Sequence, residues 1–160
     1  MENIKMKNLV LAAVAATTLF AAPAMAKDAF TGPRVEVTAG YADVSNNRTN
    51  FNYGVDAGYD VSVGPVVAGV EAGLDNVFDR RNINVAARLG AKLNSHALVY
   101  AKAGYANYRN LARHDLDGLR VGGGVELNIA GPVYTKVEYR HEDFGATKSN
   151  DVIGGVGFRF

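Results

Sequence analysis

Hydrophobic and polar residues alternate along the chain from Pro33 onward. Within one segment, Phe51 and Tyr53 share one parity, whereas Asn52 and Asp56 share the other. A repeat of two residues is typical of β-strands, because successive side chains point to opposite faces. Clusters of Asn, Asp, Gly and Pro interrupt the alternation repeatedly. The pattern predicts eight strands, at residues 34–43, 51–62, 66–75, 82–93, 97–107, 118–129, 133–142 and 151–160.

The connections between these strands alternate in length. Three short connections, at residues 63–65, 94–96 and 130–132, interleave with four longer ones. Each strand has roughly the 9–11 residues that a tilted strand needs to cross a bilayer. Short turns at one end and longer loops at the other are typical of membrane barrels. The sequence therefore predicts an all-β fold, an eight-stranded antiparallel up-and-down transmembrane β-barrel.

Charged residues fall on one face of each predicted strand and never on its apolar face. A membrane barrel places such a polar face in its lumen and its apolar face against lipid. A soluble periplasmic binding barrel would reverse the two faces and is kept as a rival. The residues predicted to line the lumen are Arg34, Glu36, Asp56, Asp60, Glu71, Asp75, Arg88, Lys92, Lys102, Arg120, Glu126, Lys136, Glu138, Arg140 and Arg159.

The glycines favour the membrane barrel. Eleven strand glycines share the charged face, whereas only Gly123 and Gly154 share the apolar face. The lumen of an eight-stranded barrel is just wide enough for side chains to fill. Long Arg and Lys side chains that point inward therefore need small neighbours, whereas a solvated outer face has no reason to save volume. We therefore predict that the charges face inward.

The N-terminal segment has the features of an export signal. Lys5 and Lys7 precede an apolar stretch at residues 9–20, which is too short to span a bilayer. Met6 is an alternative start that keeps a basic residue beside it. The predicted cleavage signal comprises Ala24, Ala26 and Lys27. We predict a signal peptide at residues 1–26 and a β-barrel domain at residues 27–160.

Composition excludes several classes of protein. Of 17 basic and 16 acidic side chains, Lys5, Lys7 and Glu2 lie in residues 1–26, so 15 of each remain afterwards. A neutral domain lacks the basic surface that nucleic-acid binding requires. The chain has no Cys, which excludes disulfides and thiolate metal sites.

The last strand carries a recognisable ending. Gly155, Phe158 and Phe160 match the assembly signal of bacterial outer-membrane barrels, although Ile153 stands where a polar residue is usual. Residues 30–160 resemble the small eight-stranded barrels of the OmpA-like and opacity porin families. The resemblance implies a Gram-negative outer-membrane location. It also implies outer-membrane lipids, lipopolysaccharide and the barrel assembly machinery as partners, with host or surface ligands at the loops.

The candidate chemistry is sparse. His96, His114 and His141 lie in different connections, so they form no metal-binding pair. Residues 114–118 resemble part of a calcium loop but lack its third ligand and distal Glu, and we expect an ordinary turn there. No residue pattern indicates a cofactor. Basic loop residues that would face lipopolysaccharide are Arg48, Arg80, Arg81, Arg109, Arg113 and Lys148.

Function is predicted from the balance of the lumen charges. Because acids and bases are nearly equal in number, mutual pairing accounts for them without a solute. We predict a structural or surface-interacting barrel with a largely plugged, charged lumen. One alternative is a narrow porin for small solutes. A second is a lipid A-modifying barrel enzyme, but position 143 is Asp, so His141 lacks a His-x-Ser arrangement.

Overall fold

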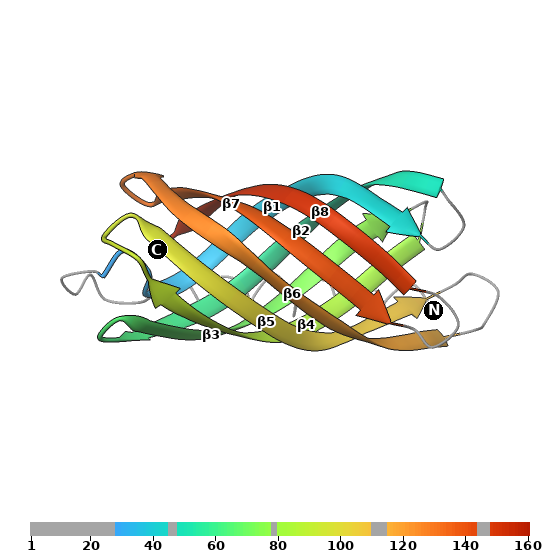
Figure 1. The fold of residues 1–160 in the computed structure, drawn as a ribbon, viewed down its shortest axis with the longest axis horizontal. Helices are drawn as coiled ribbons and strands as arrows, with labels where there is room; N and C mark the ends of the chain where they lie inside the picture. The colour runs from blue at the N-terminus through green and yellow to red at the C-terminus, as the bar shows by residue number, and fades with distance from the viewer. Residues whose placement is uncertain (1–27, 45–47, 78–79, 110–114, 144–147) are drawn as a thin grey trace, which may run out of the picture.

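The computed structural model describes residues 28–44, 48–77, 80–109, 115–143 and 148–160. Eight strands in these residues close into a barrel (Figure 1). Among the same residues, no helix is long and apolar enough to cross a membrane. The strands are β1 Gly32–Val44, β2 Arg48–Val63, β3 Val66–Val77, β4 Arg80–Lys92, β5 Ala97–Arg109, β6 Asp115–Ala130, β7 Val133–Asp143 and β8 Lys148–Arg159.

Each strand pairs antiparallel with its sequence neighbours, and β1 closes the sheet against β8. Val37 of β1, for example, lies opposite Val55 of β2 and Val156 of β8. Closure leaves no unpaired sheet edge. The register shifts once, between Asn128 and Ala130 where β6 meets β7. The predicted eight-stranded up-and-down barrel is confirmed.

Three tight turns define one end of the barrel, the turn end, which also holds the C-terminus (Figure 1). Two of these turns read Gly-Pro, and Gly64 and Gly131 adopt left-handed backbone with φ of 60° and 54°. Glycine is favoured there because a side chain strains this conformation. The third turn is held by Asn94, whose Oδ1 accepts hydrogen bonds from the backbone N–H groups of His96 and Ala97. The opposite end, the loop end, carries the longer connections.

Several strands are longer at the loop end than the alternation predicts. β2 begins at Arg48 instead of residue 51, β6 at Asp115 instead of 118, and β8 at Lys148 instead of 151. The turn expected at residues 114–118 is therefore wrong for residues 115–118, because the structure continues the β5–β6 ladder there, and residue 114 lies outside the described residues. Backbone pairing does not require an apolar face, so strands extend past the point where the alternation of side chains ends.

The barrel is apolar outside and charged inside. Val70 and Leu89 are each 61% exposed on the outer face, whereas Arg34 and Arg140 are 1% and 0% exposed in the lumen. Buried hydrophobic side chains are few, and one cluster of three is formed by Phe30, Val67 and Leu98. Ion pairs therefore fill the interior that an apolar core fills in a soluble barrel.

Candidate functional site

The charged lumen is the candidate functional site. Inward positions on all eight strands contribute to it, and each strand places its charged residues on the parity that faces the barrel axis. The following charged side chains belong to residues that are at most 4% exposed: Arg34, Glu36, Asp56, Asp60, Glu71, Asp75, Arg88, Lys102, Arg120, Glu126, Lys136, Glu138, Arg140, Glu142, Asp151 and Arg159.

Asp60 accepts hydrogen bonds from arginines of three strands. Arg88 of β4 binds it through two nitrogens, with Nε 2.8 Å from Oδ1 and Nη2 2.6 Å from Oδ2. Arg34 Nε and Arg159 Nη2 each donate to Oδ2 at 3.0 Å. Glu126 adds a second carboxylate to the same cluster, with Oε2 3.0 Å from Arg88 Nη1 and Oε1 2.8 Å from Arg159 Nη2. Charge-assisted bonds of this kind are about twice as strong as neutral ones.

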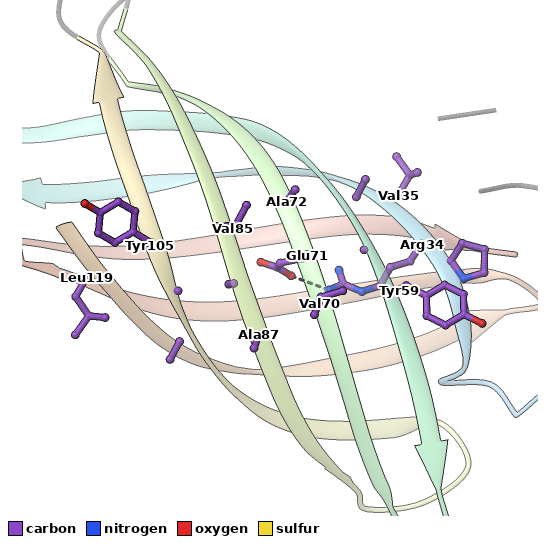
Figure 2. A pocket seen from close by; sticks show the side chains of 16 residues that line it. Arg34, Val35, Tyr59, Val70, Glu71, Ala72, Val85, Ala87, Tyr105 and Leu119 are labelled. Carbon is purple, nitrogen blue, oxygen red and sulfur yellow. Dashed lines mark hydrogen bonds and ion pairs between the residues drawn. The ribbon is translucent and has the colours of Figure 1, made fainter. Parts of the chain in front are cut away.

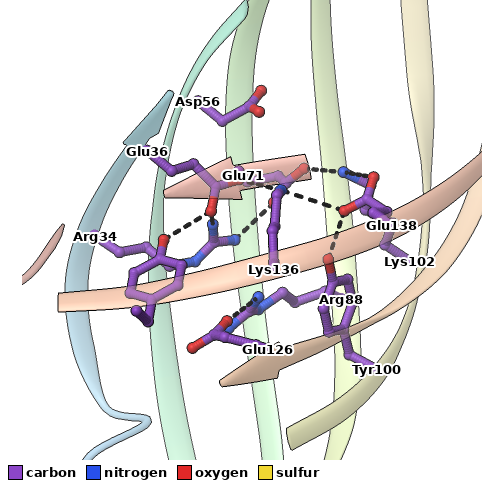
Figure 3. Close-up of polar contacts among 12 residues, drawn as sticks. Arg34, Glu36, Asp56, Glu71, Arg88, Tyr100, Lys102, Glu126, Lys136 and Glu138 are labelled. Atoms are coloured by element: carbon purple, nitrogen blue, oxygen red, sulfur yellow. Dashed lines mark hydrogen bonds and ion pairs between the residues drawn. The ribbon is translucent and has the colours of Figure 1, made fainter. Parts of the chain in front are cut away.

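Glu71 and Glu138 extend the cluster across the middle of the lumen (Figure 3). Glu71 accepts hydrogen bonds from Arg34 Nη2 at 2.6 Å and from Lys102 Nζ at 2.5 Å. Lys102 Nζ also lies 2.7 Å from Glu138 Oε1. Arg140 Nε donates to the same Glu138 oxygen at 2.5 Å. The ion pairs thus run without interruption from β1 through β3 and β5 to β7.

Two buried tyrosines donate into the network. Tyr134 OH donates to Glu36 Oε2 at 2.7 Å. Tyr100 OH donates to Glu138 Oε2 at 2.6 Å, as Figure 3 shows. Lys136 Nζ lies between the two carboxylates and pairs with both. Each tyrosine therefore adds a fixed donor to a carboxylate that already has a cationic partner.

Arginines also organise the acids nearer the loop end. Arg120 pairs with Asp75 at 2.7 Å and with Glu142 at 2.6 Å. Arg140 lies 3.4 Å from Asp56 and 3.5 Å from Asp75. These longer distances leave Asp56 less tightly bound than Asp60 and Glu126, whose shortest ion-pair distances are 2.6 Å and 2.8 Å.

Several bonded pairs join residues two strands apart, and in each of them a glycine occupies the position between the partners on the intervening strand. The strand register places Gly69 of β3 directly between Asp60 of β2 and Arg88 of β4. A Cβ at Gly69 would collide with Asp60 Oδ1. A missing side chain on the middle strand lets residues two strands apart meet across it. The same arrangement holds for Gly58 between Arg34 and Glu71, Gly157 between Glu36 and Tyr134, and Gly124 between Tyr100 and Glu138.

Sequence reasoning missed several inward residues, and four of them belong to the polar network. Tyr100 and Tyr134 carry no formal charge and were not considered as lumen residues, although they share the parity of charged neighbours on their strands. Glu142 and Asp151 occupy the end positions of the predicted strands 133–142 and 151–160 and share the inward parity, but the predicted set of lumen charges leaves them out. Strict application of parity through both ends of every strand would have found all four.

Lys92 lies apart from the other predicted lumen charges. Its Nζ pairs with Asp28, which precedes β1, and donates to the Gly64 carbonyl at 3.0 Å. Partial burial alone would raise the pKa of Asp28, but the hydrogen bonds from Lys92 and from the Phe30 amide lower it below its ordinary value. Lys92 therefore holds the segment that precedes β1, residues 28–31, at the turn end, instead of pairing with lumen acids.

The network is suited to filling space and holding strands together. Among the residues that the structure describes, no three His, Asp or Glu side chains are arranged to hold a metal ion. Each described cation around Asp60, Glu71 and Glu138 has a carboxylate partner, so none of these is left unpaired for an anionic solute. These cations are Arg34, Arg88, Lys102, Lys136, Arg140 and Arg159.

Comparison with known proteins identifies the family to which this barrel belongs. The family model of the outer membrane protein beta-barrel domain matches residues 12–160. The chain belongs to this family. It is therefore a β-barrel of the bacterial outer membrane, as the resemblance of its last strand implied. In such barrels the short turns face the periplasm and the longer loops face outward.

Several solved barrels share the fold. Neisserial surface protein A has a TM-score of 0.61 at 20% identity, with 80% of this chain and 97% of that chain covered. The outer membrane enzyme PagL has a TM-score of 0.59 at 14% identity, with 78% and 99% covered. Ail of Yersinia pestis, solved with the heparin analogue sucrose octasulfate, has 0.52 at 15% identity, with 80% and 99% covered. A search among curated proteins finds no match to this chain.

The outer face of this membrane barrel carries an apolar band with aromatic residues towards both ends. Tyr41 and Phe51 stack edge to face near the loop end, with ring centroids 5.8 Å apart. An apolar groove of about 940 Å³ lies between Tyr59 and Tyr105, over small side chains such as Ala72 (Figure 2). This surface contacts the hydrocarbon region of the bilayer.

The predicted processing and assembly residues fall in different places. Gly155 points into the lumen beside Lys136 and Thr38, whereas Phe158 and Phe160 point outward with ring centroids 4.8 Å apart. Ala24, Ala26 and Lys27 lie outside the described residues. So does His114, and the side chains of the basic loop residues are described only at Lys148, which is exposed and 3.5 Å from Asp143.

Proposed function

We propose that this outer-membrane barrel has a structural or surface-interacting role and that its lumen is plugged by the ion-pair network. The continuous chain of buried pairs from Arg159 through Asp60, Arg34 and Glu71 to Lys102 carries the proposal. A solute path along the axis would require these pairs to separate. Breaking a buried pair by removing one partner costs about 3–5 kcal/mol, because the remaining charge is uncompensated.

Planar-bilayer recording of the purified protein tests this proposal. We expect rare, small conductance steps from the unmodified barrel, with protein-free detergent as the control. Large, steady and ion-selective channels would contradict the plugged lumen and favour the narrow porin.

The narrow porin has one observation in its favour. Nearer the loop end, Asn52, Asn82 and Asn84 are buried, yet each has a side-chain atom without a hydrogen-bond partner. Buried polar groups of this kind usually bind ordered water. Water between these amides would occupy part of the lumen, but the ion pairs of Glu71 and Glu138 across the middle of the lumen separate it from the turn end.

A lipid-modifying activity finds little support in the residues at the loop-end rim. His141 faces Asn150, with Nδ1 2.8 Å from Oδ1. The nearby hydroxyl of Ser149 is buried on the inward parity and donates to Asp151 at 2.6 Å. A nucleophile must lie within hydrogen-bond reach of its base, and these two side chains occupy opposite faces of the sheet. Mass spectrometry of lipid A incubated with the protein tests this, and we expect unchanged acylation.

The proposal includes two steps that precede function, cleavage of the signal peptide and assembly of the barrel in the outer membrane. Signal peptidase cleaves between Ala26 and Lys27, and N-terminal sequencing of the protein from outer membranes should begin at Lys27. The assembly machinery recognises the last strand through Gly155, Phe158 and Phe160. The outward side chains of both Phe residues support this role, because they remain accessible before the barrel enters lipid.

The loop end is the proposed site of surface interaction. Its basic residues favour anionic partners such as lipopolysaccharide phosphates, through charge-assisted hydrogen bonds. The Ail structure with sucrose octasulfate shows that one barrel of this fold binds a sulfated ligand. Calorimetric titration of the protein with sucrose octasulfate, at low and high salt, tests the same chemistry here. Binding that weakens with salt is expected, whereas no heat at low salt would contradict an anion-binding loop end.

A further inference from the structure

Residues 28–31 fold across the turn-end mouth of the barrel. Phe30 is 1% exposed and packs with Val67 of β3 and Leu98 of β5, which are both fully buried. The parity of these strands points Val67 and Leu98 into the lumen. The Phe30 ring therefore closes an apolar layer inside the mouth, between the periplasm and the ion-pair network.

The last strand fastens this layer to the network. Arg159 Nη1 donates to the Ala29 carbonyl at 2.8 Å. Its guanidinium carbon lies 5.8 Å from the centroid of the Phe30 ring and 5.0 Å from that of Tyr134. Cations at these distances are attracted to an aromatic face. Because Nη2 of the same guanidinium binds Asp60, the Arg159 side chain joins residues 28–31 to the charged lumen.

Further contacts hold the segment from the opposite side of the mouth. Asp28 pairs with Lys92 at the end of β4, and its Oδ1 accepts a hydrogen bond from the Phe30 amide at 3.1 Å. Thr31 Oγ1 accepts a hydrogen bond from the Ser62 amide of β2 at 3.2 Å. The segment is thus attached to β2, β4 and β8, so its position does not depend on β1 alone.

We propose that residues 28–31 are a plug that seals the periplasmic mouth of the lumen against water and solutes. The plug acts in addition to the ion-pair network and consists of the chain's own N-terminal segment. Phe30 is the seal, and Arg159 and Lys92 are its two anchors. An apolar seal is effective here because the ion pairs behind it gain strength when water is excluded.

A single-cysteine reporter tests the seal, because the chain contains no native Cys. Leu98→Cys places a thiol directly behind Phe30, and a small charged methanethiosulfonate reports its accessibility in the detergent-solubilised barrel. We expect slow labelling with Phe30 present and labelling at least about tenfold faster when Phe30→Ala is added, since labelling follows the open population. Ala29→Ser is the matched control, because it changes the neighbouring exposed side chain, retains the carbonyl that Arg159 binds and should leave the rate unchanged.

Heat-modifiable gel mobility must first show that each variant is folded. If Phe30→Ala does not fold, Asp28→Asn in the Leu98→Cys background supplies the test, because it weakens one anchor without removing the seal. We then expect Leu98→Cys to be labelled measurably faster than without Asp28→Asn, but by less than the roughly tenfold increase expected for Phe30→Ala. If Leu98→Cys is labelled at the same rate alone and in combination with the folded second substitution, Phe30→Ala or Asp28→Asn, the plug is overturned. Fast labelling of Leu98→Cys with Phe30 in place would overturn it as well.

The recordings described above separate this proposal from the plugged network. A folded Phe30→Ala barrel that labels quickly but still conducts only rare, small steps supports both the plug and the network. Large channels in the unmodified protein would contradict both the network and the plug, whereas large channels that appear only with Phe30→Ala would contradict the network and support the plug.

Discussion

Arg88 and Asp60 form a bidentate pair across an intervening strand. Their bonds, at 2.8 and 2.6 Å, join β4 to β2, and Gly69 of β3 lies between them in the register. The pair can form only because position 69 has no side chain. Inward glycines in this barrel are therefore spacers that allow side chains two strands apart to meet.

Adding a methyl group at such a spacer should destabilise the barrel. Gly69→Ala would push its Cβ against Oδ1 of the Asp60 carboxylate. Three arginines bind the two oxygens of this carboxylate, so it cannot move without loss of bonds. We expect a loss of about 1–3 kcal/mol in the free energy of unfolding, measured by urea titration in lipid. Gly154→Ala is the matched control, because its Cβ would meet nothing closer than 4.0 Å. Equal losses at the two positions would contradict the spacer role.

Removing the charge of Asp60 should be far more costly than removing a surface charge. Asp60→Asn leaves Arg34, Arg88 and Arg159 buried with less negative charge beside them, and we expect a loss of about 3–5 kcal/mol in the free energy of unfolding. Asp143→Asn breaks a 3.5 Å pair with Lys148 whose side chains are 42% and 59% exposed, and about 0–1 kcal/mol is expected there. Similar unfolding free energies for both variants would show that the lumen is better hydrated than the buried pairs imply.

An arginine on the outer face should be penalised according to its depth. Val70→Arg introduces a charge in the middle of the apolar face, and a loss of about 2–4 kcal/mol is expected. Val63 is exposed at the end of β2 beside the first tight turn, so Val63→Arg should cost about 0–1 kcal/mol. The same urea titration in lipid measures both. A tolerated arginine at position 70 would argue that this face does not contact lipid.

Changing the last residue should reduce assembly more than export. In Phe160→Lys, we expect normal cleavage of the signal peptide but a several-fold lower amount of heat-modifiable, folded protein in the outer membrane. Val63→Lys serves as the control, since it places the same charge on the outer face at the turn end. Wild-type folded amounts for Phe160→Lys would remove the assembly role from Phe160.

Local sequence information was sufficient for the strands and their faces. Alternation fixes which residues share a face, and the glycines gathered on the charged face indicate that this face points inward. The inward placement of Arg34 and the outward placement of Val70 follow from these two patterns together. The loop-end boundaries did not follow, because the residues from Arg48 onward pair as strand without an apolar face that would reveal it.

The sequence by itself determined an all-β chain with eight strands, one charged face, and small residues gathered on that face. Only the tertiary structure decided which partners meet. Arg88 lies 28 residues from Asp60, and Arg159 lies 130 residues from Ala29. Such pairs depend on register, curvature and closure of β1 against β8, none of which a repeat of two residues specifies. The physical reason is that alternation is a property of one strand, whereas an ion pair across a lumen is a property of the closed barrel.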